Sequence, residues 1–182
     1  MGGVSISQSL TVNVHLTSLN LALNQIGPIG GHALATVLAD TNRTLTRLDV
    51  SGNMLGDDGV GAFSRVVRDN RVLVALNVSG NTASLVGVGA LAATIAQHNV
   101  SLTHLVHDTA RDHQDGANIR LAIGRNQHFA HLKRNIMALR LSSEQLLARR
   151  STAPRTRRGS LTNGQLPVEI CAVIFFDFCC TV

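Results

Sequence analysis

The residues best suited to chemistry gather around position 108: His104, His107, Asp108, Asp112 and His113. Imidazole and carboxylate groups in one short segment are typical of metal ligands, zinc above all. His104 and His107 are three residues apart, however, and side chains at that spacing on a strand point to opposite faces. A zinc site needs ligands that converge, and no cysteine lies nearby. We therefore predict no metal site and no cofactor.

Catalytic groups are equally scarce. The two glutamates of the chain, Glu144 and Glu169, lie in its C-terminal part, away from the histidines. Cys179 has apolar neighbours, which disfavour the reactive thiolate, and no histidine or asparagine beside it. The glycine-rich runs at 59–64 and 87–92 match a dinucleotide-binding fingerprint only in part. We predict that the protein is not an enzyme and takes no small-molecule substrate.

The composition excludes several broad classes of protein. The 182 residues are 45% apolar, which excludes a wholly disordered chain. The chain has sixteen glycines and only three prolines, which excludes a collagen-like protein. No apolar stretch reaches the roughly 18 residues of a membrane-spanning helix, and no secretory signal is visible. All three cysteines lie in the last twelve residues, so the body suits a reducing compartment. We expect a cytoplasmic protein, with a nuclear location as the alternative.

A repeat of about 28 residues organises the chain and must position these side chains. Its first column is apolar: Leu16, Leu45, Leu73, Leu102 and Phe129. Three residues later comes a second apolar column: Leu19, Leu48, Leu76, Leu105 and Leu132. A third apolar column follows after two more: Leu21, Val50 and Val78. Two columns hold asparagine: Asn24, Asn53 and Asn81, and then Asn13, Asn42, Asn70, Asn99 and Asn126. One column holds glycine: Gly30, Gly59, Gly87 and Gly116.

Each copy predicts a short strand followed by a helix. The leucine segment alternates apolar and polar residues, as a strand buried on one face does. The apolar residues then change to helical spacing over 32–39, 60–67 and 89–96. We expect Asp57 and Asp58 to cap the second of these helices. One unit cannot bury both its strand and its helix stripe, so the copies must stack around a shared core.

The runs LTSLNLALNQIGPIGGHALATVL and LTRLDVSGNMLGDDGVGAFSRVV resemble leucine-rich repeats of the long, ribonuclease-inhibitor-like class, as in NOD-like receptors. The resemblance implies an α/β solenoid of about four repeats, with short parallel strands on the concave side and helices on the convex side. The resemblance covers residues 9–141; the predicted repeats span 16–141 and decay after 102. In the fourth copy His107 and Ala110 replace the strand valine and the asparagine, and Arg134 and Met137 do so in a partial fifth copy.

The repeated polar and glycine columns have a structural interpretation. A short amide side chain at the corner between strand and turn can satisfy unpaired backbone groups of adjacent copies. Glycine supplies either a positive φ angle or a close approach of two backbones. We therefore assign no ligand to either column.

The side chains between the leucines should point to the concave face. Parallel strands lie about 4.8 Å apart, so these side chains form one continuous surface. The candidate interaction residues are Ser18, Asn20, Ala22, Arg47, Asp49, Ser51, Ala75, Asn77, Ser79, His104, Val106 and Asp108.

The segments outside the repeats differ in character. We predict one last short helix over residues 142–150. Residues 151–182 are predicted to form a disordered basic linker, followed by an apolar, cysteine-containing C-terminus. Residues 111–182 carry eleven basic and five acidic residues, whereas residues 1–110 carry five and six. Ser160 follows two arginines in a pattern that resembles a site for basophilic protein kinases, so it is a candidate for phosphorylation.

Residues 1–15 predict an incomplete N-terminal repeat. Asn13 fits the asparagine column, but we expect no strand and no helix in residues 1–8. An uncovered solenoid end exposes apolar surface and an unpaired strand edge. We therefore predict possible self-association through uncapped ends.

These observations favour a non-enzymatic protein-interaction module that binds a protein partner on its concave face. One alternative is an activator-type regulator of a small GTPase, which some ribonuclease-inhibitor-like repeat proteins are. A second is a nucleic-acid or nuclear protein that acts through the arginine-rich tail.

Overall fold

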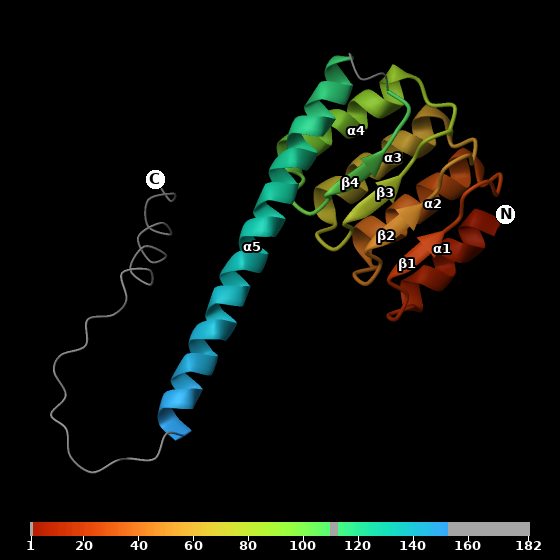
Figure 1. The fold of residues 1–182 in the computed structure, drawn as a ribbon. Coiled ribbons are helices and arrows are strands. Elements are labelled where there is room, and N and C mark those ends of the chain that lie inside the picture. Colours follow the sequence, from red (N-terminus) through yellow and green to blue (C-terminus); the bar gives the residue numbers. More distant parts are fainter. Residues whose placement is uncertain (1, 110–112, 153–182) are drawn as a thin grey trace, which may run out of the picture. The chain divides into compact units, whose positions relative to one another are not determined.

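The computed structural model describes residues 2–109 and 113–152 (Figure 1). Helices and strands alternate along these residues: α1 (Gly2–Val12), β1 (Ser18–Asn20), α2 (Gly27–Asp40), β2 (Arg47–Asp49), α3 (Gly56–Asp69), β3 (Ala75–Asn77), α4 (Leu85–His98), β4 (His104–Val106) and α5 (Gln114–Thr152). The chain divides into two compact units at Ala138, so the last part of α5 belongs to a second unit. The repeats lie in the first unit.

The four strands form one parallel sheet in the order β1-β2-β3-β4, with the helices α1 to α4 on one side of it (Figure 1). Leu19, Leu48, Leu76 and Leu105 are direct neighbours across the sheet. Residues of one repeat column therefore stand side by side. The arrangement confirms the predicted solenoid of about four repeats.

One hydrophobic core lies between the sheet and the helices. Its strand-side members include Leu45, Leu48, Val50, Leu73, Leu76, Val78 and Leu102. Its helix-side members include Leu34, Leu38, Phe63, Val66, Leu91 and Ile95. All of these are at least 97% buried. The apolar faces of the sheet and of the helices are therefore shielded from water only because the two layers pack on each other.

Asn53 joins the first repeat to the second. Its Nδ2 donates to the carbonyl oxygens of Leu21 and Val50, at 2.7 and 3.0 Å. Its Oδ1 accepts from the N–H groups of Asn24 and Ile26, at 2.9 and 3.2 Å. One fully buried amide thus satisfies backbone groups of two adjacent repeats, as predicted for this column.

Asn81 repeats this arrangement one copy later. Its Nδ2 donates to the carbonyl oxygens of Val50 and Val78, at 2.9 and 2.8 Å. Its Oδ1 accepts from the N–H groups of Asn53 and Leu55, at 2.8 and 3.4 Å. The two amides form a ladder, which we call the turn ladder, because each rung holds the turn of the repeat before it.

The second asparagine column forms a helix-end ladder. Asn42 donates from Nδ2 to the carbonyl oxygen of Leu10, at 2.9 Å, and its Oδ1 accepts from the Leu45 N–H. Asn70 donates in the same way to the carbonyl oxygen of Leu38, at 2.7 Å. Each amide connects the start of its own strand with the end of the helix one repeat earlier.

Close approach of helix backbones explains the predicted glycine column. A Cβ atom on Gly87 would lie 2.8 Å from the Cα of Asp57, and one on Gly59 would lie 3.4 Å from the Cα of Pro28. The positive φ angles fall at other glycines, for example Gly52 at 64°.

Asp57 does not cap its own helix as expected, because it lies in the first turn of α3 and no side chain caps that helix. Its carboxylate instead accepts from the N–H and Oγ of Ser84, at 2.7 and 2.8 Å, and from the Gly87 N–H. The hydrogen bonds from Ser84 lower the pKa of Asp57 below its usual value. The carboxylate therefore stabilises the start of α4, one repeat away.

Residues 2–12 form helix α1, so the expectation that residues 1–8 hold no helix is wrong. Leu10 is 3% exposed and Ile6 packs against the core. A Cβ atom on Gly3 would lie 2.9 Å from the Cα of Gly30, which shows how closely α1 approaches α2. Small and apolar residues thus suffice to add one more convex helix.

The partial fifth copy forms no strand. Phe129, Leu132, Arg134 and Met137 all lie within α5, which runs unbroken from Gln114 to Thr152. The short helix expected at 142–150 is the end of this same helix.

Asn126 explains why a helix can follow the fourth repeat. Although it lies in α5, its Nδ2 donates to the carbonyl oxygen of Leu102, at 2.9 Å, and to Oδ1 of Asn99. Ile119 and Ala122 of α5 are 2% and 4% exposed and complete the core. Asn126 therefore still bonds to the fourth repeat, but to Leu102 and Asn99 rather than to the end of a helix, as Asn42 and Asn70 do.

We predict that Leu48→Ala and Leu76→Ala each lower the free energy of unfolding by about 2–5 kcal/mol, because both side chains are at least 97% buried. Urea denaturation measures the change. Val100→Ala is the control, since Val100 is 57% exposed and its truncation should change the free energy by less than about 0.5 kcal/mol. Equal effects at all three positions would contradict the assignment of the core.

Candidate functional site

The concave face of the sheet carries the residues that the sequence analysis selected. Ser18, Arg47, Ala75 and His104 are neighbours across the four strands, and so are Asn20, Asp49, Asn77 and Val106. Their side chains line a groove of about 350 Å³. Ala22, Ser51, Ser79 and Asp108 follow directly after the strands. The structure therefore brings the predicted residues together on one surface.

Arg47 is the cation in the middle of this face. It is exposed, and its neighbours on β1 and β3, Ser18 and Ala75, are too small to cover it. Within the described part of the chain, its guanidinium has no carboxylate in ion-pair contact. A guanidinium flanked by small side chains is open to a carboxylate or phosphate from outside.

Asp49, by contrast, is already engaged. Its Oδ1 accepts from the N–H and Oγ of Ser51, at 2.9 and 2.6 Å, and its Oδ2 accepts from Nδ2 of Asn77, at 3.1 Å. Partial burial alone would raise the pKa of Asp49, but these hydrogen bonds outweigh it and hold the pKa below the usual value. The carboxylate stays charged in a fixed orientation two residues from Arg47.

Asp108 also has a structural partner, because its Oδ2 accepts from the Gly80 N–H at 2.6 Å. It fixes the turn after β3 at the rim of the face. The hydrogen bond across 28 residues was not foreseen from the sequence, although the position in the repeat could have indicated it.

Comparison with known proteins supports the repeat architecture. The family described as "Leucine Rich repeat" matches residues 12–35 and 41–64. Together with the parallel sheet and its asparagine ladders, this match identifies residues 12–35 and 41–64 as leucine-rich repeats. A search of curated proteins found no significant match to the sequence.

Two solved structures are similar to this chain. "Leiomodin-1 Actin-Binding Site 2 (ABS2)" covers 77% of this repeat protein and 80% of its own chain, with a TM-score of 0.69 and 20% identity. The match to the tropomodulin C-terminal domain of Caenorhabditis elegans covers 73% of this chain and 96% of that domain, with a TM-score of 0.47 and 11% identity. At 20% identity the likeness to leiomodin-1 is one of fold alone.

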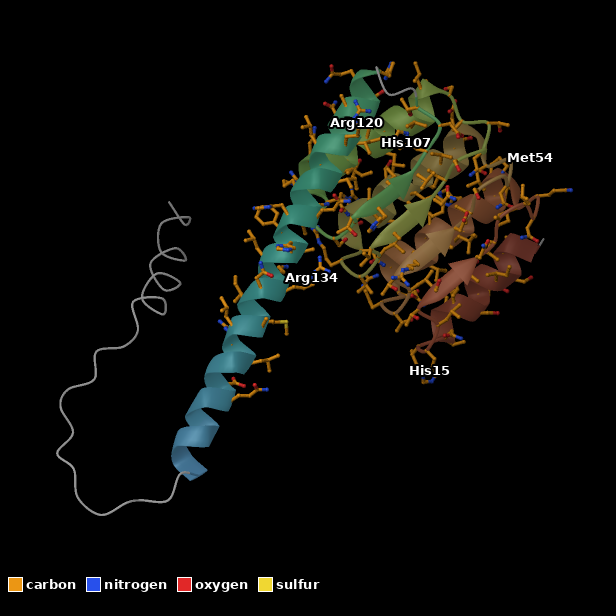
Figure 2. The ribbon with its side chains drawn as sticks, in the orientation of Figure 1. His15, Met54, His107, Arg120 and Arg134 are labelled. Atoms are coloured by element: carbon orange, nitrogen blue, oxygen red, sulfur yellow. The ribbon has the colours of Figure 1, made fainter. Side chains whose placement is uncertain are left out.

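The histidines after the third repeat do not converge. His104 is exposed on the concave face, whereas His107, which lies just after β4 (Figure 2), is half-buried. His113 Nδ1 lies 3.3 Å from an oxygen of Asp115, and Asp112 lies outside the described residues. Among residues 2–109 and 113–152, no group of three or more His, Cys, Asp or Glu side chains could hold a metal ion.

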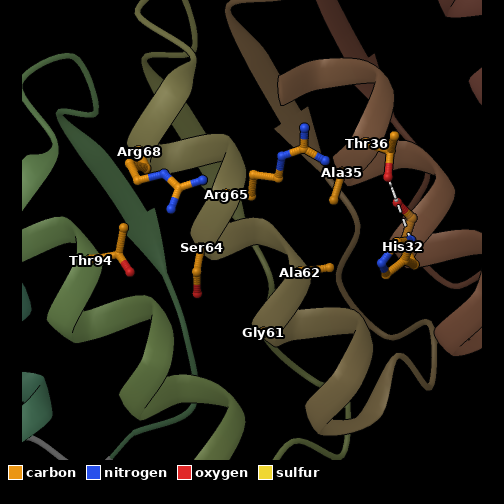
Figure 3. A pocket seen from close by; sticks show the side chains of 9 residues that line it. All are labelled: His32, Ala35, Thr36, Gly61, Ala62, Ser64, Arg65, Arg68 and Thr94. Atoms are coloured by element: carbon orange, nitrogen blue, oxygen red, sulfur yellow. Dashed lines mark hydrogen bonds between the residues drawn. The ribbon is translucent and has the colours of Figure 1, made fainter. Parts of the chain in front are cut away.

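A second groove, of about 350 Å³, runs over the convex helices α2, α3 and α4 (Figure 3). Arg65 and Arg68 of α3 line it together with the small residues Ala35 and Ala62. Both arginines are paired: Arg65 with Asp40 at 2.6 Å, and Arg68 with Asp69 at 3.0 Å. Their charges are compensated within the protein, so the concave face is the better candidate site.

The remaining predictions concern the C-terminal part of the chain. Ser160 and the basic and apolar segments of residues 153–182 lie outside the described residues, so the predictions of phosphorylation and of nucleic-acid binding through the tail stay predictions. None of the described helices is both long and apolar enough to span a membrane.

We predict that acid destabilises the protein through His107. Burial lowers the pKa of His107, and nearby Arg120 adds to this effect while Asp108 opposes it. Because the folded state holds the proton less tightly than the unfolded state, the free energy of unfolding should fall as the pH drops below about 6.5. His107→Val should remove this part of the pH dependence, at the cost of the acceptor that His107 Nδ1 offers to the Thr109 N–H.

Urea midpoints at about pH 8 and about pH 5.5 measure the effect. Val100→Ala, at an exposed residue that does not titrate, is the control and should leave the pH dependence unchanged. Zinc-dependent melting that disappears in His107→Val would overturn this account in favour of a metal site.

Proposed function

We propose that the protein is a non-enzymatic interaction module whose concave face binds a protein partner through an acidic group. The observation that carries the proposal is Arg47, an exposed cation at the centre of the groove with no ion pair among the described residues. On the convex side, the exposed arginines Arg65 and Arg68 of α3 are paired with aspartates. A cation without an ion pair on this face can be neutralised by a partner's carboxylate.

The surroundings of Arg47 define the chemistry of the partner. Ser18 and Ala75 leave room for a partner side chain on either side of the guanidinium. Asp49 offers a charged acceptor that Ser51 and Asn77 hold in one orientation. A segment with an acidic residue close to a hydrogen-bond donor therefore fits this surface, and little rearrangement of the protein would be needed.

The fold likeness suggests one protein to test first. The leiomodin-1 structure is described as an actin-binding site, so actin is a defined probe for the concave face. None of the described residues favours the alternative of a small-GTPase regulator.

We predict that Arg47→Glu weakens binding of a concave-face partner about tenfold or more, because it places a like charge against the partner's acidic group. The immobilised full chain is tested against actin and against partners captured from cell extract, with dissociation constants measured for each. Arg68→Glu is the matched control, since it reverses an exposed arginine on the convex side. Partners that bind both variants as tightly as the parent chain would contradict the proposal, and so would equal losses in both variants.

A further inference from the structure

Two basic residues, Arg47 and His104, stand on either side of Ala75 on the concave face. Ala75 of β3 is the direct neighbour of Arg47 on β2 and of His104 on β4. All three residues line the same groove. Adjacent parallel strands lie about 4.8 Å apart, so the backbones of Arg47 and His104 are separated by roughly 10 Å. Between the two basic side chains there is only the methyl group of Ala75.

The ring of His104 is exposed and is held by one of its two nitrogens. Nδ1 lies 2.9 Å from Oγ1 of Thr103, whose hydroxyl has one hydrogen to donate. The other acceptor for this hydrogen, the carbonyl oxygen of Val74, is farther away, at 3.4 Å. We therefore assign the hydroxyl hydrogen to Nδ1, which places the proton of the neutral ring on Nε2. The Thr103 contact is the ring's only hydrogen bond among the described residues, so the Nε2 N–H is available to a group from outside.

The carboxylates of the concave face do not compete for these two basic groups. Asp49 and Asp108 both accept hydrogen bonds from other groups of the protein, at 2.6 to 3.1 Å. Neither Arg47 nor His104 takes part in an ion pair among the described residues. Both basic side chains can therefore receive an acidic group from a partner.

The two sides of Arg47 differ in what they offer to a carboxylate. On one side lies Ser18 of β1, whose hydroxyl is short and stays close to the sheet. On the other side lies Ala75, and beyond it the longer side chain of His104. An imidazole can also bind a proton and become a cation, which a hydroxyl cannot do. The Ala75 side therefore provides two nitrogen donors for the two oxygens of one carboxylate.

We propose that the partner's acidic side chain lies above Ala75, where one carboxylate oxygen accepts from the Arg47 guanidinium and the other from Nε2 of His104. This inference rests on the proposed function, and it adds the side of Arg47 that the acidic group occupies. His104 becomes a specificity-determining residue, because it binds the second oxygen. Ala75 contributes through its size, because any larger side chain would fill the space of the carboxylate. The ligand is an aspartate or glutamate in an exposed segment of a protein partner.

Nuclear magnetic resonance of the isotopically labelled full chain tests the proposal without a natural partner. The probe is a capped glycine–aspartate–glycine peptide, and the same peptide with asparagine in place of aspartate is its uncharged control. We expect saturable shifts with the aspartate peptide at the backbone amides of Ala75 and His104 and at the imidazole of His104. The asparagine peptide should cause none. The absence of saturable shifts, or equal shifts with both peptides, would overturn the proposal.

Two leucine substitutions decide which side of Arg47 the carboxylate occupies. Ala75→Leu should weaken binding of the aspartate peptide about tenfold or more, because the larger side chain fills the space while both basic groups remain. Ser18→Leu is the matched control, since it enlarges the other neighbour of Arg47, and it should bind as tightly as the parent chain. The same spectra report whether each variant is folded. A loss in Ser18→Leu alone, or equal losses in both variants, would contradict the proposal.

His104→Ala separates this inference from the proposed function. It removes the second donor and should weaken the aspartate peptide about tenfold, because a hydrogen bond to a charged group is lost. If Arg47→Glu abolishes binding while His104→Ala and Ala75→Leu bind as tightly as the parent chain, the proposed function stands and this inference is wrong. If Arg47→Glu leaves binding unchanged, the proposed function is wrong as well.

Discussion

The buried asparagine amide that connects one repeat with the next is the interaction on which the rest of the structure depends. A solenoid turn leaves backbone N–H and C=O groups that water cannot reach, and each of these must find a partner. Asn53 and Asn81 satisfy such groups in their own repeat and in the repeat before. Because each amide spans two repeats, it fixes the distance and the register between their strands. The concave columns follow from that register.

Much of the fold could be predicted because the repeat length is almost constant. Because equivalent positions of successive copies are 28 or 29 residues apart, residues of one column become neighbours across the sheet. The pairing of Arg47 with Ser18 and Ala75 is a direct result. The sequence could not reveal that Arg47 has no ion pair among the described residues, since that depends on which carboxylates the folded chain brings near it. Asp49 lies two residues away but is held by Ser51 and Asn77.

Departures from the pattern occur where a residue acts across repeats or where the repeat ends. Asp57 stabilises the start of α4 rather than of its own helix, because the close approach at Gly87 brings it within reach of Ser84. Residues 2–12 lack a strong helical stripe, and α1 forms through packing on α2. In α5, Asn126 bonds to Leu102 and Asn99 of the fourth repeat instead of to a helix end, and the backbone around it is helical rather than extended. Neither its hydrogen bonds nor its backbone conformation follows the repeat column at this end.

Native-state hydrogen exchange on Asn81→Ala tests the role of the amide most directly. The N–H groups of Asn53 and Leu55 donate to Oδ1 of Asn81, whereas those of Asn24 and Ile26 donate to Asn53. If each asparagine holds the preceding turn, the substitution should remove protection at Asn53 and Leu55 first and leave Asn24 and Ile26 less affected. Protection that is unchanged at Asn53 and Leu55, or lost equally at all four amides, would contradict the account.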